Sequence, residues 1–280
     1  MLAGVEYGRQ RSAMDLAQLL LPTARLMADA ARDAALPHFR SAANTAENKA
    51  AVGYDPVTEA DRAAERAMRQ VLAKHRPDDG IEGEEYGASA GTSGVTWYLD
   101  PIDGTRAFVA GLTSWTTLIG AVEGDRPVLG IIDQPWIDER YIGLTAAERS
   151  SWLEGRGQRI ALKTRDCPKL TDAILSTTDP FILTPPERGA FEHIRATARL
   201  TRYGLDAYAY ARLAAGTIDM VTETGLKAHD VAALIPVIEG AGGVVTDWRG
   251  NTPQLGGQIV ASANRAILDE ALISLRRSAL

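Results

Sequence analysis

The sequence predicts an α/β protein in two halves, an α+β half at residues 1–145 and an α/β half at residues 146–280. In the first half, two helical patterns precede a group of short strand-like runs. In the second half, strand-like runs alternate with helical ones, which is typical of an α/β layer. The 280 residues are 45 % hydrophobic and 24 % charged, so the chain can bury a sizeable core as one large domain or two small ones.

Helical spacing of apolar residues opens the first half. It covers residues 13–40 and predicts one long helix, or two helices split near Pro22. The polar stretch at residues 41–55 is expected to form a mobile loop, and a second helix is expected from Thr58 to about His75. Short β-rich runs separated by glycine-containing turns then predict neighbouring strands of one sheet. These runs cover residues 97–99, 115–123 and 127–133.

Strands and helices alternate through the second half of the chain. The strand-like runs cover residues 174–177, 220–222, 244–246 and 258–261. The helical patterns cover residues 187–200, 207–215, 230–239 and 264–274. The sequence contains no internal repeat and no low-complexity tract, so a layered α/β structure is expected in this half.

The charge balance argues against a nucleic-acid-binding protein. The formal net charge is −6 at pH 7, and the Lys and Arg residues are not concentrated in any one stretch. Binding to a phosphate backbone requires clustered positive charge. An anionic substrate would therefore need a local pocket that is cationic or filled by a metal ion.

Cysteine content and the N-terminal sequence indicate a cytoplasmic protein. Cys167 is the single cysteine, so no intramolecular disulfide can form. The first residues lack the basic segment followed by an apolar segment that a secretory signal requires. No uninterrupted apolar run approaches the roughly 20 residues needed to cross a bilayer. We therefore expect a protein of the reducing cytosol that does not insert into membranes.

The most informative segment is D-P-I-D-G-T at residues 100–105, which directly follows an apolar strand-like run. Asp100 and Asp103 supply two carboxylates at the end of that strand, and Mg²⁺ prefers hard oxygen ligands of this kind. Gly104 and Thr105 can offer unobstructed backbone N–H groups and a hydroxyl to a phosphate. In isolation, the same Asp-Gly pair more often marks a hairpin turn, so the context must decide between the two interpretations.

Three further acidic groups each have a structural explanation of their own. Glu84 and Glu85 form a loop pair, and such pairs usually lie on a solvated surface. Asp61 follows Thr58 by three residues, as in a helix capping box. Asp230 precedes an apolar helical run and could act as its N-cap, a common role for aspartate. Taken singly, each group is explained more simply by structure than by catalysis.

Together these acidic groups resemble the inositol-monophosphatase superfamily. The matching elements are D-P-V-T-x-x-D at residues 55–61, G-E-E at residues 83–85, D-P-I-D-G-T at residues 100–105, and H-D-V-A-A with G-A-G-G at residues 229–243. The last two elements are highly specific, and the resemblance covers nearly the whole chain. It implies an αβαβα layered sandwich with the site between the α+β half and the α/β half.

The resemblance also implies a role for each matching residue. The ligands implied for two to three Mg²⁺ ions are Glu84, Asp100, the carbonyl of Ile102, Asp103 and Asp230. Asp61 and Thr105 would orient the attacking water and help to deprotonate it, and Glu84 is included among the catalytic residues. Gly104 and Thr105 would also hold the phosphate.

The implied chemistry is metal-assisted hydrolysis of a phosphate monoester. Two or more metal ions can neutralise the transferring phosphoryl group, activate a water and stabilise the leaving alkoxide in an in-line displacement. This reaction requires no covalent intermediate, which agrees with the lack of any recognisable Ser or Cys nucleophile arrangement. Cys167 lies in a polar stretch with no motif around it.

Within the superfamily, the sequence resembles the monofunctional histidinol-phosphate phosphatases. Arg106 and Ala107 stand where inositol phosphatases generally have Thr-Asn. Glu223 and Asp206 match positions that contact the organic part of substrates, so they are candidates for binding the histidinol amine or imidazole by charge-assisted hydrogen bonds. Asp206 is equally interpreted as the N-cap of a helix that begins at Ala207. The stretches that carry this resemblance cover residues 103–108, 133–135, 203–210 and 223–227.

Several residues beside these motifs have more than one interpretation. Leu205 replaces a glycine of that branch, and Ala228-His229 replace a proline and an aromatic residue, so the pocket wall there is expected to differ. His229 is interpreted as a packing residue, with donation to substrate as the alternative. Lys49 aligns with a lysine that approaches the site in inositol phosphatases, although a solvated lysine is the preferred interpretation. Arg106 lies next to the phosphate turn and is a candidate for binding the substrate or its phosphate, and it is expected to form an ion pair within the site or across a subunit interface.

The resulting hypothesis is a Mg²⁺-dependent phosphomonoesterase that hydrolyses L-histidinol phosphate to L-histidinol and phosphate, a step of histidine biosynthesis. The alternatives are other esters on the same fold, such as inositol phosphate, fructose bisphosphate or a 3′-phosphoadenosine nucleotide. An alternative of another class is an interaction protein with secondary phosphatase activity. The expected partners are a small-molecule phosphate ester and a second copy of the chain in a homodimer, with no nucleic acid and no membrane.

Overall fold

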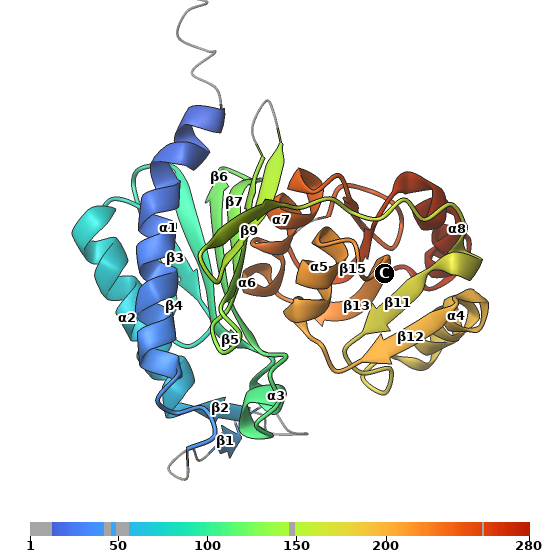
Figure 1. Ribbon diagram of the computed structural model, residues 1–280, viewed down its shortest axis with the longest axis horizontal. Helices are drawn as coiled ribbons and strands as arrows, with labels where there is room; N and C mark the ends of the chain where they lie inside the picture. Colours follow the sequence, from blue (N-terminus) through green and yellow to red (C-terminus); the bar gives the residue numbers. More distant parts are fainter. Residues whose placement is uncertain (1–12, 42–45, 49–55, 146–148, 254) are drawn as a thin grey trace, which may run out of the picture.

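The computed structural model describes residues 13–41, 46–48, 56–145, 149–253 and 255–280. Figure 1 shows five layers in which helices and sheets alternate across the molecule. Helices form one outer layer, a large sheet follows, and a second group of helices lies in the middle. A second sheet and two outer helices complete the sandwich. The predicted αβαβα architecture is confirmed.

The first outer layer consists of the helices α1 (Ala13–Ala35) and α2 (Glu59–His75). Their small and apolar residues face the large sheet and are buried in a common core with it. Helix α1 continues through Pro22, as one of the two predicted alternatives required, but it ends at Ala35 and not at residue 40. The backbone before a proline disfavours the helical region, and Leu36 precedes Pro37. The prediction for α2 is confirmed.

The first sheet consists of β3 (Gly80–Gly83), β4 (Gly87–Ser89), β5 (Val95–Asp103), β6 (Thr116–Glu123), β7 (Arg126–Gln134), β8 (Glu139–Leu144), β9 (Ser150–Gly155) and β10 (Gln158–Ala161). The strand order is β10-β9-β8-β7-β6-β5-β3-β4. All neighbours are antiparallel except β3 and β5, which are parallel. A separate antiparallel pair is formed by β1 (Ala46–Asn48) and β2 (Pro56–Thr58).

The strands predicted at residues 97–99, 115–123 and 127–133 are confirmed as parts of β5, β6 and β7. The sequence pattern does not indicate β10, because this strand is exposed along its whole length and so has no apolar run. Strands β9 and β10 extend the first sheet to Ala161. The division expected between residues 145 and 146 therefore falls inside this sheet.

A row of three glycines brings two middle helices directly onto the first sheet. Gly120, Gly130 and Gly143 are paired across the adjacent strands β6, β7 and β8. A Cβ at Gly130 would lie 2.0 Å from the Ala233 carbonyl oxygen. A Cβ at Gly143 would lie 2.2 Å from the Pro236 carbonyl oxygen. No side chain fits there, so the row fixes the segment that carries Asp230. The middle layer consists of α5 (Ala207–Ala214), α6 (Ala228–Val231) and α7 (Leu234–Gly240).

The second sheet consists of β11 (Ile174–Thr177), β12 (Leu200–Tyr203), β13 (Met220–Leu226), β14 (Val244–Asp247) and β15 (Gly257–Ser262). Its order is β12-β11-β13-β15-β14, with β11 parallel to both neighbours and β15 antiparallel to both. The outer helices are α4 (Pro185–Thr197) and α8 (Arg265–Leu275). The remaining short helices are α3 (Thr105–Val109), η1 (Leu170–Asp172) and η2 (Arg276–Ser278).

The second half follows the predicted order of elements with two differences. The helix predicted over residues 187–200 ends at Thr197, and the chain then forms β12, whose pairing with β11 no local pattern indicates. The helix predicted over residues 230–239 is divided into α6 and α7. The division coincides with the point where Ala233 meets the glycine row of the first sheet.

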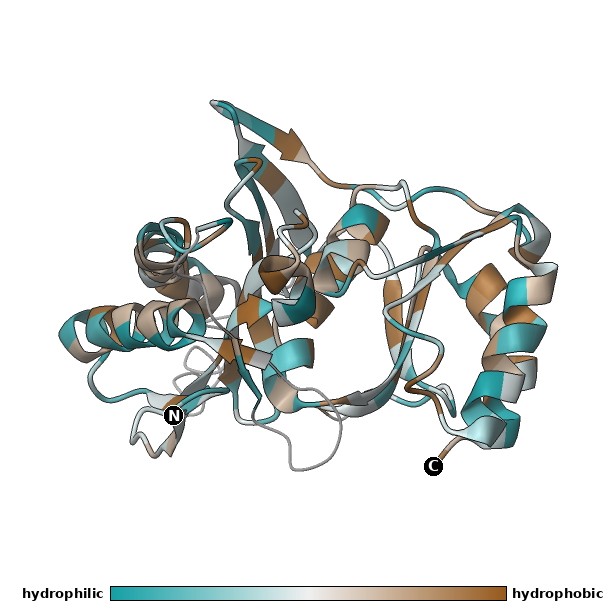
Figure 2. Ribbon diagram, turned by 90° about the horizontal axis from the view of Figure 1, so that it is seen from below, coloured by the Kyte–Doolittle hydropathy of each residue, from teal (hydrophilic) through white to brown (hydrophobic). Residues whose placement is uncertain are grey.

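Hydropathy follows the layers of the sandwich. Figure 2 shows hydrophobic residues along the strands inside the molecule, whereas the helices at its surface carry both hydrophobic and hydrophilic residues. This distribution is typical of amphipathic helices that pack one face on a sheet. Within the described residues, no helix combines the length and the apolar character that crossing a membrane requires.

Candidate active site

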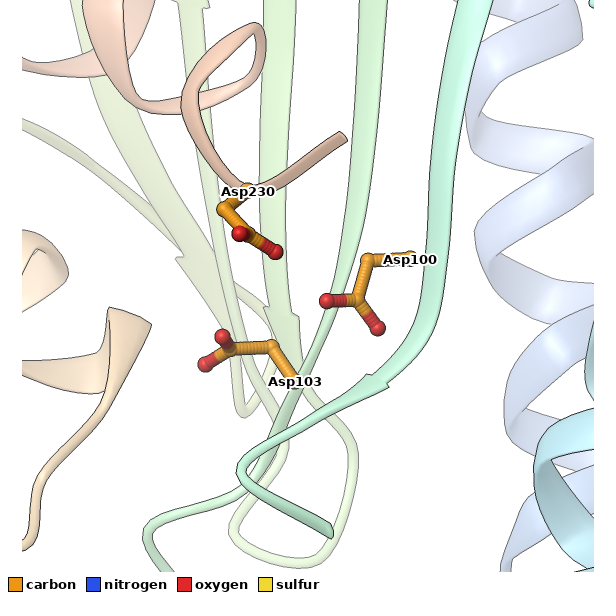
Figure 3. A group of neighbouring side chains, drawn as sticks. All are labelled: Asp100, Asp103 and Asp230. Carbon is orange, nitrogen blue, oxygen red and sulfur yellow. The ribbon is translucent and has the colours of Figure 1, made fainter. Parts of the chain in front are cut away.

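Three aspartates converge between the two halves of the molecule (Figure 3). Residues three apart on a regular strand point to opposite faces. Strand β5, however, shifts its register against β6 between Asp100 and Asp103, and both carboxylates lie near Asp230 of α6 (Figure 3). One carboxylate oxygen of each residue lies within 4.8 Å of the other two. A bulged strand and the helix seated on the glycine row therefore build one acidic cluster.

Burial and like charge act together on this cluster. Burial, followed by the charges of Glu84, Asp103 and Asp230, holds the pKa of Asp100 well above its ordinary value. Burial and the charges of Asp206 and Asp230 likewise hold the pKa of Asp103 well above its ordinary value. Crowded carboxylates favour either protonation or a bound cation. The arrangement can therefore hold a metal ion, for which carboxylate oxygens are suitable ligands.

Glu84 lies at the edge of the acidic cluster. Its backbone N–H donates to the Leu99 carbonyl at 3.1 Å, which continues the parallel pairing of β3 and β5 and places Glu84 beside Asp100. The Glu84 charge is the largest charge effect on the pKa of Asp100. The structure thus brings together the four predicted acidic ligands, although their role as ligands stays a prediction.

Asp61 of α2 lies close to Thr105, the last residue of the D-P-I-D-G-T segment. Asp61 is fully buried. Its Oδ2 accepts from the Thr58 backbone N–H at 2.7 Å and from the Thr58 hydroxyl at 2.6 Å, which confirms the capping box at the start of α2. The Thr105 hydroxyl lies 3.0 Å from the Ile102 carbonyl oxygen and 3.4 Å from Asp61 Oδ1, and it can donate to either. The capping role leaves one oxygen of Asp61 facing the predicted site.

A pocket of about 140 Å³ adjoins the acidic cluster. Four carboxylate side chains line it, and its lining contains no Lys or Arg residue of the described chain. Apolar contacts come from Ile182, Leu226 and Leu234. The four acidic residues are Asp103, Asp206, Glu223 and Asp230.

Glu223 is buried on β13 at the wall of this pocket. One of its oxygens accepts from the Thr178 backbone N–H at 2.7 Å and from the Thr178 hydroxyl at 2.9 Å. Burial outweighs these hydrogen bonds and raises the pKa of Glu223 to about 8. Glu223 is therefore mainly protonated at neutral pH until a cation approaches it.

Asp206 lies at the N-cap position of α5, but its side chain makes no capping hydrogen bond. Asp103 supplies that bond from the first sheet, because its Oδ2 accepts from the Ala207 backbone N–H at 2.6 Å. The capping alternative for the Asp206 side chain is therefore wrong. Its backbone is strained, with φ of 47°, and burial raises its pKa to about 6 against the opposing charge of Arg106.

The match to known proteins agrees with this geometry. A model of the inositol monophosphatase family matches residues 16–280. The chain belongs to the inositol monophosphatase family. Its solved members include an inositol monophosphatase from Zymomonas mobilis that is 39 % identical, with a TM-score of 0.79 over 91 % of this chain and 96 % of that chain.

Two relatives within the family carry different names. The chloroplastic bifunctional phosphatase IMPL2 of Arabidopsis thaliana is 40 % identical over 226 residues, which cover 80 % of this chain and 63 % of that protein. The chain thus spans less than two thirds of that relative's length. A histidinol-phosphatase of Mycobacterium tuberculosis is 35 % identical over 223 residues, which cover 79 % of this chain and 84 % of that protein.

The other residues that the sequence singled out differ in how close they lie to the acidic cluster and the pocket. Gly104 is the N-cap residue of α3 with φ of 81°, and a Cβ there would lie 3.1 Å from Asp206 Oδ2. Arg106 is half-exposed and lies 4.0 Å from Asp179 of the same chain. The ring of His229 is buried 3.6 Å from Asp230 Oδ1 and does not line the pocket. Lys49 lies outside the described residues.

Glu65 is a residue that the sequence patterns did not single out. It is fully buried on α2, where it accepts from the backbone N–H groups of Glu85 at 2.7 Å and of Tyr86 at 3.2 Å. The Arg69 guanidinium pairs with it at 2.8 Å. A Cβ at Gly83 would lie 2.0 Å from its carboxylate. Glu65 therefore anchors the loop that carries Glu84. The sequence signal for this residue is its spacing of four residues from Asp61, which places both on the same face of the helix.

Glu65→Gln is expected to lower the free energy of unfolding by about 2–3 kcal/mol, because the buried charge that pairs with Arg69 is lost and the amide nitrogen that replaces one oxygen cannot accept a hydrogen bond. Urea unfolding curves would measure the change. Glu59→Gln on the same helix is the matched control, since its ion pair with Arg66 is exposed and should contribute little. Equal effects of the two substitutions would contradict the anchoring role.

Proposed function

We propose that this chain is a Mg²⁺-dependent phosphomonoesterase that hydrolyses L-histidinol phosphate to L-histidinol and phosphate. The observation that carries the choice of ester is the charge of the pocket beside the acidic cluster. Its four carboxylate residues and the lack of basic residues in its described lining favour an organic group that carries positive charge. The amine of histidinol phosphate provides that charge, whereas inositol phosphate has no cationic group.

The acidic cluster fits Mg²⁺ in ligand type and spacing. Asp100, Asp103 and Asp230 each offer a hard oxygen within 4.8 Å of the other two. We assign these residues, with Glu84 and the Ile102 carbonyl, as the ligands of two to three ions. When bound, such ions neutralise phosphoryl charge and make a nearby water more acidic.

Thr105 and Asp61 are assigned to the attacking water. The Thr105 hydroxyl oxygen would accept a hydrogen bond from the water, and its own proton would pass toward Asp61 Oδ1 at 3.4 Å. The first turn of a helix leaves backbone N–H groups without partners, so Gly104 and Thr105 at the start of α3 are assigned to the phosphate. Cys167 is buried behind the second sheet in the core of the outer layer, so it takes no part as a nucleophile.

A comparison of substrates tests the proposal directly. Phosphate release would be measured with Mg²⁺ for histidinol phosphate, inositol phosphate and fructose bisphosphate. We expect kcat/KM to be highest for histidinol phosphate, and we expect a chelator to stop the reaction. A higher kcat/KM for inositol phosphate would overturn the assignment of the ester but would leave the phosphatase assignment in place.

Glu223→Gln is expected to lower kcat/KM for histidinol phosphate about 10- to 150-fold, because one charge-assisted hydrogen bond to the amine is lost. Wild-type kcat/KM should rise as the pH increases toward the Glu223 pKa of about 8, because a larger fraction of Glu223 is then ionised. The variant should not show this rise. Hydrolysis of an aryl phosphate, which has no amine, should change much less.

The matched control for this substitution is Glu239→Gln. Burial also raises the pKa of Glu239, but this residue pairs with Arg149 and does not line the pocket. Its substitution should leave the ratio of kcat/KM between the amine substrate and the aryl phosphate unchanged. An unchanged ratio in Glu223→Gln as well would remove Glu223 from the specificity argument.

A further inference from the structure

Tyr210 has a buried hydroxyl that no group of the described residues satisfies. The side chain extends from α5, is only 2 % exposed, and its hydroxyl makes no hydrogen bond within the described chain. Tyr210 lines the same pocket as Asp206 and Glu223. A buried polar group without a partner is costly, and such groups often mark a place where a ligand binds.

Neighbouring tyrosines indicate that the fold can satisfy such hydroxyls where no ligand is needed. Tyr208 lies two residues earlier on the same helix and donates to Glu139 Oε2 at 3.0 Å. Tyr141 of the first sheet donates to the same oxygen at 2.6 Å. These bonds lie on the side of α5 that faces the first sheet, whereas Tyr210 faces the pocket.

The chemistry of the group defines what it can bind. Burial, followed by the charge of Glu223, holds the pKa of Tyr210 well above its ordinary value, so the phenol stays neutral. A neutral phenol oxygen can accept a hydrogen bond from a cationic donor. A primary ammonium carries three N–H donors. With Glu223 and Asp206, Tyr210 provides a third acceptor group in the same pocket.

We infer that the Tyr210 hydroxyl binds the primary ammonium of the substrate and, together with Glu223 and Asp206, determines specificity for an amine-bearing phosphate ester. This inference rests on the proposed function and deepens it. Tyr210 does not touch the reacting phosphorus in this assignment. Its hydroxyl acts on substrate choice, so its loss should appear mainly in KM for the amine substrate.

Tyr210→Phe tests the inference, because it removes only the hydroxyl and keeps the ring. The substrates are histidinol phosphate and its deamino analogue, 3-(imidazol-4-yl)propyl phosphate. We expect the ratio of their kcat/KM values to fall about 10-fold in the variant, mainly through a higher KM for histidinol phosphate. The ligand-free variant should unfold at a temperature no lower than wild type, because the Tyr210 hydroxyl has no hydrogen-bond partner among the residues that the structure describes.

Tyr208→Phe is the matched control on the same helix. It removes a hydroxyl that bonds Glu139 outside the pocket, so the substrate ratio should not change and the unfolding temperature should fall. If Tyr210→Phe left the ratio of the two kcat/KM values unchanged, the inference would be overturned, while the wild-type preference for histidinol phosphate would still stand. A wild-type preference for inositol phosphate would instead overturn the proposed function, and the inference with it.

Discussion

Asp103→Asn is expected to lower kcat for phosphate release by a factor on the order of 10³ or more, with Mg²⁺ in excess. Asp103 is one of the three carboxylates whose oxygens lie within 4.8 Å of one another, so its loss removes charge from the centre of the proposed metal site. Asparagine has nearly the same volume and keeps an oxygen that can accept from the Ala207 N–H. The fold should therefore be retained.

The same substitution has an opposite expected effect on the stability of the ion-free protein. The pKa of Asp103 is raised in the folded state, so its contribution to stability is present below its ordinary pKa of 3.8 and is lost as the pH rises through the raised value. Above that value the charges of Asp206 and Asp230 repel the ionised Asp103 carboxylate, and asparagine removes this repulsion. Calorimetry in a chelator should show a higher Tm for the variant, and added Mg²⁺ should raise its Tm less than that of wild type.

Asp133→Asn provides the contrasting control. Asp133 is a fully buried carboxylate of the first sheet that pairs with Arg140 at 2.7 Å and with Arg32 at 3.1 Å. Its substitution should lower Tm, because Arg140 and Arg32 each lose their buried carboxylate partner, and should leave the Mg²⁺ dependence of activity unchanged. An Asp103→Asn enzyme within a few-fold of wild-type activity would contradict the metal assignment.

The acidic cluster was predictable because its residues lie in short motifs. Asp100 and Asp103 follow an apolar strand in the printed sequence, and Asp230 precedes an apolar helical run. The fold class was predictable for a similar reason, since helices and strands of the sandwich repeat their apolar residues at characteristic spacings. The meeting of Asp230 with the other two, however, came from resemblance to a family and not from spacing.

The contacts that position the site depend on tertiary structure and leave little local signal. The row of Gly120, Gly130 and Gly143 exists only once β6, β7 and β8 are in register. Glu65 gains its role from a loop that follows it by about twenty residues, and a buried glutamate on a helix resembles a solvated one in sequence. The unsatisfied hydroxyl of Tyr210 likewise became recognisable only when the hydrogen bonds of its neighbours were known.

Asp61→Asn and Thr105→Ala are each expected to lower kcat about 100- to 1000-fold, and the double variant should be little worse than the poorer single one. The Thr105 hydroxyl lies 3.4 Å from Asp61 Oδ1, so the two groups are expected to act on the water as one unit. Single-turnover rates with saturating substrate and Mg²⁺ would provide the comparison. Fully additive losses would show that the two residues act separately.

Stability measurements separate this role from the capping box that Asp61 also forms. If capping were its only function, Asp61→Asn would reduce the free energy of unfolding by about 1 kcal/mol and leave activity largely intact. Asn264→Ala is the matched control, because Asn264 caps α8 by accepting from the Ile267 N–H at 3.2 Å, far along the chain from the acidic cluster. The control should lose similar stability and no activity. Asp61→Asn should lower both stability and activity, because one oxygen of Asp61 accepts from Thr58 while the other faces the Thr105 hydroxyl.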